Sequence, residues 1–301
     1  MTSAEIRDAP APAKLNLFLH VTGRRADGYH ELETAFQLID LQDRVHLRRR
    51  EDGQITRVNA LPDVPPEQDL TVRAARLLQQ HGASAFGVDI RLDKHIPMGG
   101  GLGGGSSDAA TVLLALNQLW ALNWPRARLE ALAIQLGADV PFFVRGHNAW
   151  VEGIGEDITP ISLPTEVLNT PLALLKPPIA VPTVAIFGSP FLQRDTKRAI
   201  VEDFLAAPQR FGRNDLQAPA EQYSNQYGSQ ISQALEIMQK RFGNSRMTGS
   251  GSTVFSWATT NTSQSPCFQP ADVNLDDHAW VGRVTHGLVH HPLLDLLKPI
   301  D

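Results

Sequence analysis

The 301-residue sequence holds a single cysteine, Cys267. One cysteine excludes an intramolecular disulfide and argues against a cysteine-based metal site. Long hydrophobic runs are also missing. The longest apolar stretch with helical character, residues 111–124, is interrupted by Asn117, Gln118 and Asn123, and it is too short to span a bilayer. The sequence therefore predicts neither a disulfide framework nor a membrane span.

A secretory signal is absent as well. Glu5, Arg7 and Asp8 stand where an apolar core is needed, and the apolar run 15–19 is broken by Asn16. Motif-like sequence begins at residue 12, which leaves no room for a transit peptide. We therefore expect a soluble cytoplasmic globular protein.

The charge balance shows no excess of basic residues. The net charge is −5, the pI is about 6.1, and 20% of the residues are charged. Such a chain is a poor nucleic-acid binder, so an anionic substrate needs locally placed donors. With 42% hydrophobic residues, the chain can bury one large or two medium cores. We expect no nucleic acid, no membrane and no obligatory protein partner.

Hydrophobic periodicity predicts a mixture of helices and strands, hence an α+β fold. We expect Gly82 to cap the first helix, and the polar stretch 259–272 to form a surface loop. Prolines within residues 160–172 predict a domain boundary, which divides the chain into residues 1–165 and 166–301. The predicted strands span residues 14–21, 33–41, 44–48, 88–93, 149–154, 172–176 and 253–257, and the predicted helices span 70–81, 106–122, 126–136, a segment after Pro182 and 229–240.

The strongest motif is a glycine-rich loop that leads directly into an amphipathic helix. Six glycines in seven positions leave the backbone amides uncovered, and the first turn of a helix offers unpaired N–H donors. Together they predict a phosphate-binding cradle, in which the two serines that follow cap the helix, donate to phosphate or help hold a metal ion. A flexible linker or tight turn is the alternative. The spacing matches neither a Walker A loop nor a dinucleotide fingerprint. The predicted cradle comprises Pro97, Met98, Gly99, Gly100, Gly101, Leu102, Gly103, Gly104, Gly105, Ser106 and Ser107.

The loop and the residues after it, 97–110, resemble the ATP-binding motif of the GHMP kinases. The tripled glycines resemble the diphosphocytidyl-methylerythritol kinase branch of that superfamily. Further segments of the chain agree with this branch in the same order. They are residues 12–19, 23–32, 136–143, 182–183 and 247–255, with residues 214–216 also similar but without an assigned role.

Phosphorylation of an alcohol needs a route for the hydroxyl proton and positive charge near the transferring phosphoryl group. Asp139 stands between Gly137 and Pro141, on a constrained turn where a carboxylate can act as general base. Lys14, on the first predicted strand, can keep that carboxylate ionised. The resemblance implies the same two roles. Taken alone, Asp139 is an ordinary turn residue and Lys14 an ordinary surface lysine.

A second group of residues is predicted to bind the acceptor. Tyr29 can stack on a nucleobase, and His30 can hydrogen-bond a pyrimidine edge. The resemblance implies that Tyr29 and His30 hold cytosine, and that Phe187 closes the other side of the base. It also places Asn16 near the methylerythritol end and Thr183 among the contacts from the second domain. Packing at a turn is the alternative for Tyr29 and His30, and core packing for Phe187.

The resemblance implies a two-domain fold, with an N-terminal mixed α/β domain, a C-terminal ferredoxin-like domain and an active-site cleft between them. It implies transfer of the ATP γ-phosphoryl group to the 2-hydroxyl of 4-diphosphocytidyl-2-C-methyl-D-erythritol, in non-mevalonate isoprenoid synthesis. Mg²⁺ is expected with ATP, and no metal ligand is assigned. His290 and His291 have no convincing metal-ligand spacing and are predicted to lie at the surface.

Two other functions remain open. A different GHMP activity, such as a homoserine, mevalonate or sugar kinase, is disfavoured by the Gly28–Tyr29–His30 segment, because those substrates have no base to stack. A non-catalytic relative that only senses ligand is disfavoured by the presence of both Lys14 and Asp139.

Overall fold

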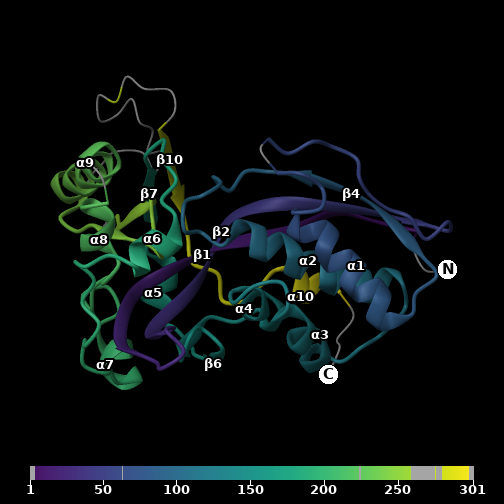
Figure 1. Ribbon diagram of the computed structural model, residues 1–301, viewed down its shortest axis with the longest axis horizontal. Helices are drawn as coiled ribbons and strands as arrows, with labels where there is room; N and C mark the ends of the chain where they lie inside the picture. Colours follow the sequence, from purple (N-terminus) through teal and green to yellow (C-terminus); the bar gives the residue numbers. More distant parts are fainter. Residues whose placement is uncertain (1–3, 63, 224, 259–274, 276–279, 298–301) are drawn as a thin grey trace.

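The computed structural model describes residues 4–62, 64–223, 225–258, 275 and 280–297. Helices and strands are mixed along the chain, which confirms the predicted α+β class. Two long strands run from the larger part of the molecule into the smaller one, and helices cover one side of the larger sheet (Figure 1). The polar stretch 259–272 and Cys267 lie outside the described residues.

The larger sheet is built on two long antiparallel strands, β1 (Glu5–Arg24) and β2 (His30–Arg50). The other edge of β2 pairs with β5 (Ala149–Glu152) and with β4 (Gly87–Asp93). Two shorter strands complete this sheet, β3 (Ile55–Arg57) beside β4 and β6 (Asp157–Pro160) beside β5.

The prediction of two strands over residues 33–41 and 44–48 was wrong, because β2 is continuous. Pro12 pairs with Gln42, but the next residue of β1, Ala13, pairs with Ile39. This register shift places the irregular residues in a bulge, so the strand continues through them.

Four helices lie between β3 and β5 in the chain, with β4 after the first of them. They are α1 (Leu70–Gly82), α2 (Gly104–Leu119), α3 (Arg126–Ala133) and α4 (Val140–Arg145). Gly82 is not the cap of α1; Ala83 takes the left-handed conformation there, with φ 46°. Helix α2 begins two residues before its predicted start and ends three before its predicted end, and α3 is three residues shorter than predicted.

The second sheet has the strand order β10-β7-β9-β8, with every neighbouring pair antiparallel. Numbered in chain order this is 4-1-3-2, the arrangement of a ferredoxin-like sheet. Its strands are β7 (Leu172–Lys176), β8 (Arg246–Met247), β9 (Val254–Trp257) and β10 (Val281–Thr285). The helices of this half are α5 (Thr165–Asn169), α6 (Thr183–Phe187), α7 (Val201–Ala206), α8 (Gln217–Glu221) and α9 (Asn225–Phe242).

After β10 the chain returns to the larger sheet. The Leu288 amide donates to the Leu38 carbonyl at 2.8 Å, and the His291 amide donates to the Gly146 carbonyl at 2.8 Å. The short helix α10 (Leu293–Leu296) then packs into the hydrophobic core beneath that sheet. His291 is fully buried, so its predicted surface position was wrong. The division of the chain at residue 165 remains a prediction.

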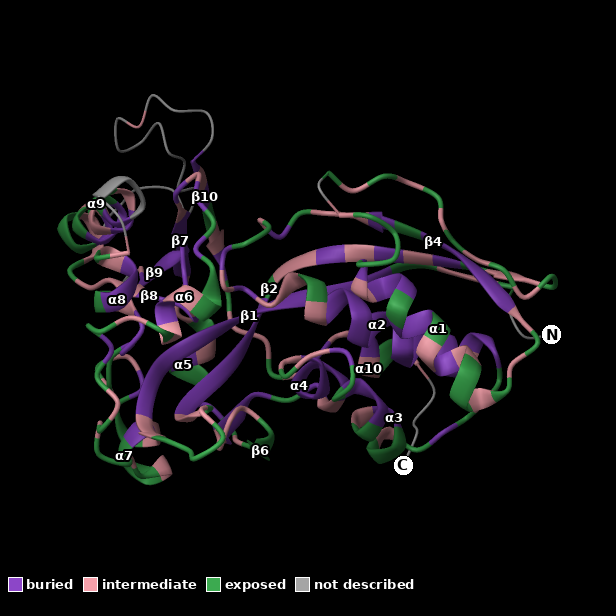
Figure 2. Cartoon of the chain, viewed as in Figure 1, coloured by how far each residue is buried: buried purple, intermediate pink, exposed green. Residues whose placement is uncertain are grey.

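Figure 2 shows buried residues along the middle of both long strands and along α2. Helix α2 is buried almost all round, because it lies between the sheet and the helices α1 and α4. Among the described residues, no helix combines the length and the apolar character that crossing a membrane requires.

Candidate active site

The outer edge of β1 brings together segments that are far apart in the sequence. The Lys14 amide donates to the Leu102 carbonyl at 3.0 Å, and the Leu19 amide donates to the Arg213 carbonyl at 2.9 Å. Between them, the Asn16 amide donates to Thr248 Oγ1 at 2.8 Å. One strand edge therefore fixes the glycine-rich loop, the Thr248–Ser252 loop and the segment around Asn214 relative to one another.

The glycine-rich loop needs its glycines for two separate reasons. Gly99, Gly101 and Gly103 have φ values of 66°, 75° and 71°, which favour glycine. A Cβ on Gly101 would also lie 2.6 Å from the Thr248 carbonyl oxygen. The loop thus combines backbone conformation with close packing against the second small-residue loop.

The serines do not cap α2 as predicted. Gly103 is the N-cap residue and no side chain bonds to the first turn, because the helix begins at Gly104. Ser106 lines the cavity beside the loop, whereas Ser107 is fully buried and its hydroxyl has no hydrogen-bond partner among the described residues. Of the two, only Ser106 faces the predicted phosphate site.

A cavity of about 380 Å³ lies along the outside of the loop. Its wall contains most of the predicted cradle, residues 97–106, together with Leu61, Asp69, Lys94 and Asp108. The exposed amides of the loop and the N-terminus of α2 point to anion binding at this end.

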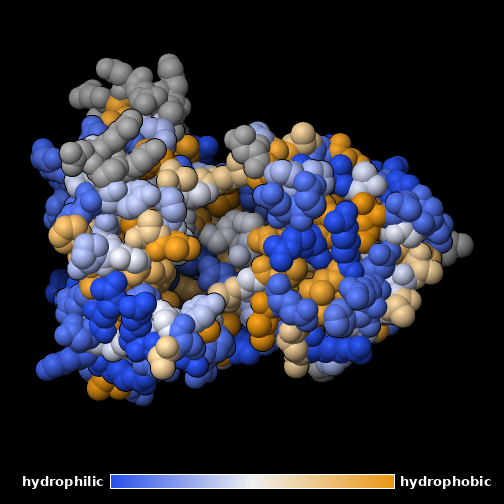
Figure 3. Space-filling model, viewed as in Figure 1, coloured by the Kyte–Doolittle hydropathy of each residue, from blue (hydrophilic) through white to orange (hydrophobic). Residues whose placement is uncertain are grey.

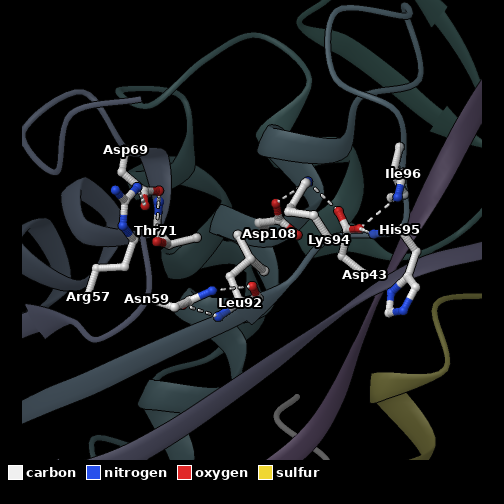
Figure 4. Close-up of polar contacts among 10 residues, drawn as sticks. All are labelled: Asp43, Arg57, Asn59, Asp69, Thr71, Leu92, Lys94, His95, Ile96 and Asp108. Carbon is white, nitrogen blue, oxygen red and sulfur yellow. Dashed lines mark hydrogen bonds and ion pairs between the residues drawn. The ribbon is translucent and has the colours of Figure 1, made fainter. Parts of the chain in front are cut away.

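A buried charge network supports this wall (Figure 4). Asp43, fully buried within β2, accepts from the His95 amide at 2.5 Å and from the Ile96 amide at 2.8 Å. Lys94 Nζ donates to Asp43 and to Asp108 Oδ2, the latter at 2.8 Å. The network joins β2, the end of β4 and the first turns of α2, so it fixes where the glycine-rich loop begins.

The charges of this network depend on its burial. Burial raises the pKa of Asp108 to about 8, and the Lys94 ammonium offsets only part of that rise. Burial lowers the pKa of Lys94, but Asp108 and Asp43 outweigh it and raise the pKa above its ordinary value. Lys94 stays charged between them.

A second buried ion pair lies nearby in Figure 4. Arg57 Nη1 donates to Asp69 Oδ2 at 2.7 Å, and the other Asp69 oxygen caps α1 by accepting from the Thr71 amide at 2.8 Å. Asn59 exchanges two hydrogen bonds with the Leu92 backbone, at 2.8 and 3.0 Å. These contacts hold the segment before α1 against β4, at the outer end of the cavity.

The predicted catalytic pair lies in a second cavity of about 380 Å³. Lys14 Nζ is 3.4 Å from Asp139 Oδ2 and donates to Asn16 Oδ1 at 2.7 Å. It also lies over the Phe36 ring, 4.3 Å from its centroid. The Lys14 side chain is 5% exposed and that of Asp139 is 34% exposed, so the lysine is fixed while the carboxylate can reach a ligand.

Asp139 and Asn16 are positioned by their elements. Asp139 precedes α4, whose N-terminal end favours a negative charge. Asn16 Nδ2 donates to Thr34 Oγ1 at 3.0 Å, which orients its oxygen toward Lys14. The two predicted residues Lys14 and Asp139 thus meet across about 125 positions of sequence, on a strand edge and a helix start.

The Thr248–Ser252 loop contributes Gly249, Ser250 and Gly251 to the wall of this second cavity. Asn214 Nδ2 holds the loop by donating to the carbonyls of Met247 and Gly249 at 2.7 and 2.8 Å. Asn214 had no role assigned from the sequence, and the structure supplies one.

The predicted acceptor residues Tyr29, His30, Thr183 and Phe187 line a third cavity, of about 540 Å³. Tyr29 is 61% exposed, and the rings of His30 and Phe187 stack with centroids 5.2 Å apart. Thr183 Oγ1 lies 2.8 Å from Ser250 Oγ, which connects this end to the second cavity.

The three cavities form one continuous trough. The first and second share Gly99, Gly101 and Gly103. The second and third cavities share four wall residues, which are Leu32, Ile154, Thr183 and Phe187. Figure 3 shows the surface hollowed between the part that carries α9 and the part that carries α1. The predicted catalytic pair lies between the predicted phosphate-binding end and an aromatic end.

Sequence reasoning missed several residues that support this trough. Asp43 lies in β2, Lys94 directly after β4 and Asp108 in α2, while Arg194, whose guanidinium contacts His30, stands in a segment without periodicity. No local signal marked Asp43, because its neighbours Gln42 and Arg44 are polar too.

The chain also matches known proteins in sequence. Residues 69–147 match the GHMP kinases N terminal domain. The chain is 56% identical to 4-diphosphocytidyl-2-C-methyl-D-erythritol kinase of Methylibium petroleiphilum over 97% of this chain and 98% of that protein. It is 50% identical to the kinase of the same name from Ralstonia nicotianae, over 96% of each.

Solved structures of kinases also match the fold of this chain. A crystal structure of 4-(cytidine 5'-diphospho)-2C-methyl-D-erythritol kinase superposes with a TM-score of 0.71 at 35% identity, covering 84% of this chain and 89% of that one. A mevalonate kinase superposes with a TM-score of 0.66 at 13% identity, covering 95% and 99%, which shows the fold alone. The chain therefore has the two-domain GHMP kinase fold, and it belongs to the 4-diphosphocytidyl-2-C-methyl-D-erythritol kinase family.

Proposed function

We propose that this protein is an ATP-dependent kinase that phosphorylates the 2-hydroxyl of 4-diphosphocytidyl-2-C-methyl-D-erythritol, giving the 2-phosphate and ADP for non-mevalonate isoprenoid synthesis. The observation that carries the proposal is the Lys14–Asp139 pair, 3.4 Å apart, in the middle of a trough with a glycine-rich loop at one end and aromatic side chains at the other.

Asp139 is proposed to accept the proton of the acceptor hydroxyl. Lys14, 3.4 Å from that carboxylate, orients it and directs positive charge toward the transferring phosphoryl group. Asn16 keeps the ammonium in place through its 2.7 Å hydrogen bond. Because Lys14 is almost fully buried, its orientation does not depend on solvent.

The backbone amides of the glycine-rich loop and the first turn of α2 are proposed to bind the phosphates of ATP. The six glycines of the loop carry no side chain, so their amides can approach an anion closely. Gly101 and Gly103 line both the first and second cavities, which supports a phosphate end next to the proposed catalytic pair.

Mg²⁺ is proposed to enter with the nucleotide. Within the described part of the chain, no group of three or more acidic, histidine or cysteine side chains could hold an ion. This fits Mg²⁺, which commonly takes most of its ligands from water and substrate phosphates. Bound there, it neutralises charge that develops on the phosphoryl oxygens. Ser106, which lines the first cavity, is the hydroxyl best placed to assist.

At the other end, Tyr29 and Phe187 are proposed to hold the cytosine ring, with His30 bonding its edge. Thr183 and Asn16 stand between that base and the catalytic pair, in the second cavity. An acceptor without a base would leave the third cavity, of about 540 Å³, unfilled.

An acceptor panel tests this function. The purified protein is given ATP and Mg²⁺ with the cytidylated acceptor, with methylerythritol 4-phosphate, and with homoserine, mevalonate and galactose, and ADP is measured. We expect turnover with the cytidylated acceptor. Equal turnover with methylerythritol 4-phosphate would contradict the base requirement, and no turnover with any acceptor would favour a ligand-sensing relative.

The Asp139→Asn variant tests the mechanism, because it keeps the shape of the side chain and removes its charge. General-base catalysis contributes about 10²–10⁴-fold, so turnover is expected to fall by that order while the dissociation constants of both substrates change little. Asp157, an exposed acidic residue at the start of β6, provides the matched control as Asp157→Asn. Retention of more than about a tenth of the wild-type turnover would overturn the assignment of Asp139.

A further inference from the structure

Arg194 connects the two parts of the molecule at the acceptor end. Its Nη2 donates to the carbonyls of Phe187 and Ser189 at 3.0 and 2.9 Å, and its Nη1 donates to the Leu192 carbonyl at 2.9 Å. Its Nε donates to Nε2 of His30, the first residue of β2, at 3.0 Å. The three carbonyl contacts fix the guanidinium, so its fourth contact has one defined direction.

That fourth contact determines the protonation of His30. Arginine stays protonated in proteins and has donors but no acceptor, so His30 Nε2 must carry its lone pair toward Arg194. In a neutral imidazole the proton then sits on Nδ1. An imidazolium has no lone pair on Nε2, and it would place a second positive charge 3.0 Å from the guanidinium.

The electrostatic surroundings agree with a neutral ring. Burial lowers the pKa of His30, and the charges of Arg194 and Arg24 lower it further. The Arg24 guanidinium is directed to the Gly28 carbonyl at 3.3 Å. No carboxylate is among the causes that act on this histidine.

We propose that Arg194 is a positioning residue for the acceptor: it holds His30 as the Nδ1–H tautomer, so that the ring presents an N–H donor to the pyrimidine. This inference rests on the proposed function, because it acts on the same base site. Cytosine offers neighbouring acceptors at O2 and N3, whereas uracil carries a proton on N3. A fixed donor therefore favours a cytosine edge over a uracil edge.

The stacking of His30 supports the same role. The His30 and Phe187 rings lie 29° from parallel, and Arg194 bonds both the His30 ring and the Phe187 carbonyl. One guanidinium therefore fixes the donor and the aromatic wall on which the base is proposed to stack. Loss of Arg194 would free both at once.

The first experiment needs no substrate and measures the tautomer in the wild-type protein. In ¹⁵N-labelled, ligand-free protein, the His30 signals are assigned by their loss in His30→Asn, and long-range ¹H–¹⁵N spectra at pH 7.5 identify the nitrogen that bears the proton. We expect the proton on Nδ1 and an unprotonated Nε2. A proton on Nε2, or an imidazolium, overturns the inference.

The second experiment uses Arg194→Met, which keeps the apolar stem and removes the donors and the charge. The control is Arg198→Met. The Arg198→Met substitution removes the same charge four residues away. The Arg198 side chain is 68% exposed, and its ion-pair distances to Glu31, Glu33 and Glu152 are 3.8–4.0 Å. Thermal unfolding confirms that both variants are folded before kinetics are measured.

In Arg194→Met we expect a tautomer mixture at His30 and a roughly 2- to 10-fold higher KM for the cytidylated acceptor, with KM for ATP unchanged. The preference for cytidine diphosphate over uridine diphosphate as a competing ligand should shrink by a similar factor. A KM that stays at the wild-type value while the tautomer changes overturns the positioning role. Failure of the proposed function is seen separately, as absence of turnover in the wild-type protein.

Discussion

The two ends of the trough present different kinds of chemical group to a ligand. At the phosphate end the ligand-facing groups are backbone amides of a glycine-rich loop, supported by the buried charges of Asp43, Lys94 and Asp108. At the acceptor end they are side chains, and Tyr29 is 61% exposed while its neighbour in the cavity, Val184, is 86% exposed. We therefore expect ligand binding to depend on the folded core more strongly at the first end than at the second.

This difference has a physical origin. Backbone amides can meet an anion closely only where glycines hold unusual φ values, and such a loop needs rigid neighbours to keep its shape. An aromatic ring at a cavity mouth needs only its own side chain. We therefore expect substitutions at the phosphate end to affect stability and nucleotide binding together, and substitutions at the acceptor end to affect acceptor binding alone.

Removing Asp43 should have the largest effect on stability. Asp43→Ala deletes the acceptor of two backbone amides and of the Lys94 ammonium. Breaking a buried charge pair costs about 3–5 kcal/mol, so the free energy of unfolding in urea should fall by that amount. Asp52→Ala is the control, since Asp52 pairs with Arg50 at the surface, where such pairs contribute at most about 1 kcal/mol. Equal losses in the two variants would contradict the account of the network.

Gly103→Val should weaken nucleotide binding and lower stability together. Gly103 has φ 71°, and a Cβ there would lie 2.9 Å from the Phe143 ring and 3.1 Å from Lys14 Cγ. Strain of this kind costs up to about 3 kcal/mol of stability, and calorimetry with an ATP analogue should also show a loss of affinity, because the loop is displaced. Gly243→Val separates strain from contact, because Gly243 has φ 72° but nothing within 4 Å of its Cβ position. An unchanged nucleotide dissociation constant in Gly103→Val would count against the cradle.

Tyr29→Ala should weaken binding of the acceptor and leave binding of ATP unchanged. Stacking of one base on an aromatic ring is worth about 1–3 kcal/mol, so KM for the cytidylated acceptor should rise accordingly. Stability should change little, because the side chain is mostly exposed. Phe191→Ala removes another exposed aromatic, 58% exposed, and serves as the control. If both variants raise KM equally, Tyr29 is not the stacking residue.

The smallest expected effect is a pH dependence of stability that arises in the core under the larger sheet, away from both ends of the trough. His291 packs against Thr111 of α2, and its Nδ1 accepts from the Leu293 amide at 3.1 Å. Burial lowers the pKa of His291 to about 3, and the neighbouring His290 and Arg126 contribute less. Because the folded state resists protonation, the stabilising contribution is present above pH 6.5 and is lost as pH falls toward 3.

Between pH 7.5 and pH 5.5 the contribution of His291 to stability should fall by about 1.4 kcal/mol. Urea unfolding of the wild type and of His291→Gln at both pH values isolates it as the difference between the two pH dependences. Identical pH dependences would show that His291 titrates normally. His30, which is only partly buried, should contribute less to this pH dependence.

The sequence was informative where the signal is local. The strand 172–176 was predicted with the bounds that the structure gives to β7, because a short apolar run between prolines carries its own evidence. Motifs with fixed chemistry were also found, and Lys14 and Asp139 do meet. Their catalytic roles stay predictions.

The sequence was uninformative where distant residues meet. Lys94 looks like a surface lysine until Asp43 and Asp108 are placed on either side of it, 51 and 14 positions away. The burial of His291 depends on the contact between the C-terminal segment and the larger sheet. No pattern within residues 286–297 predicts that contact. Arg194 contacts His30, which is 164 positions away in the sequence. Such contacts follow from the fold and not from periodicity.

The most direct test of the account is a double-mutant cycle across the trough. The dissociation constants of an ATP analogue and of cytidine diphosphate are measured for the wild type, Gly103→Val, Tyr29→Ala and the double variant. If the two ends are separate, each substitution changes one ligand only, and the losses add within about 0.3–0.5 kcal/mol. A change in both ligands from either single variant, or a larger coupling between the two, would contradict the account.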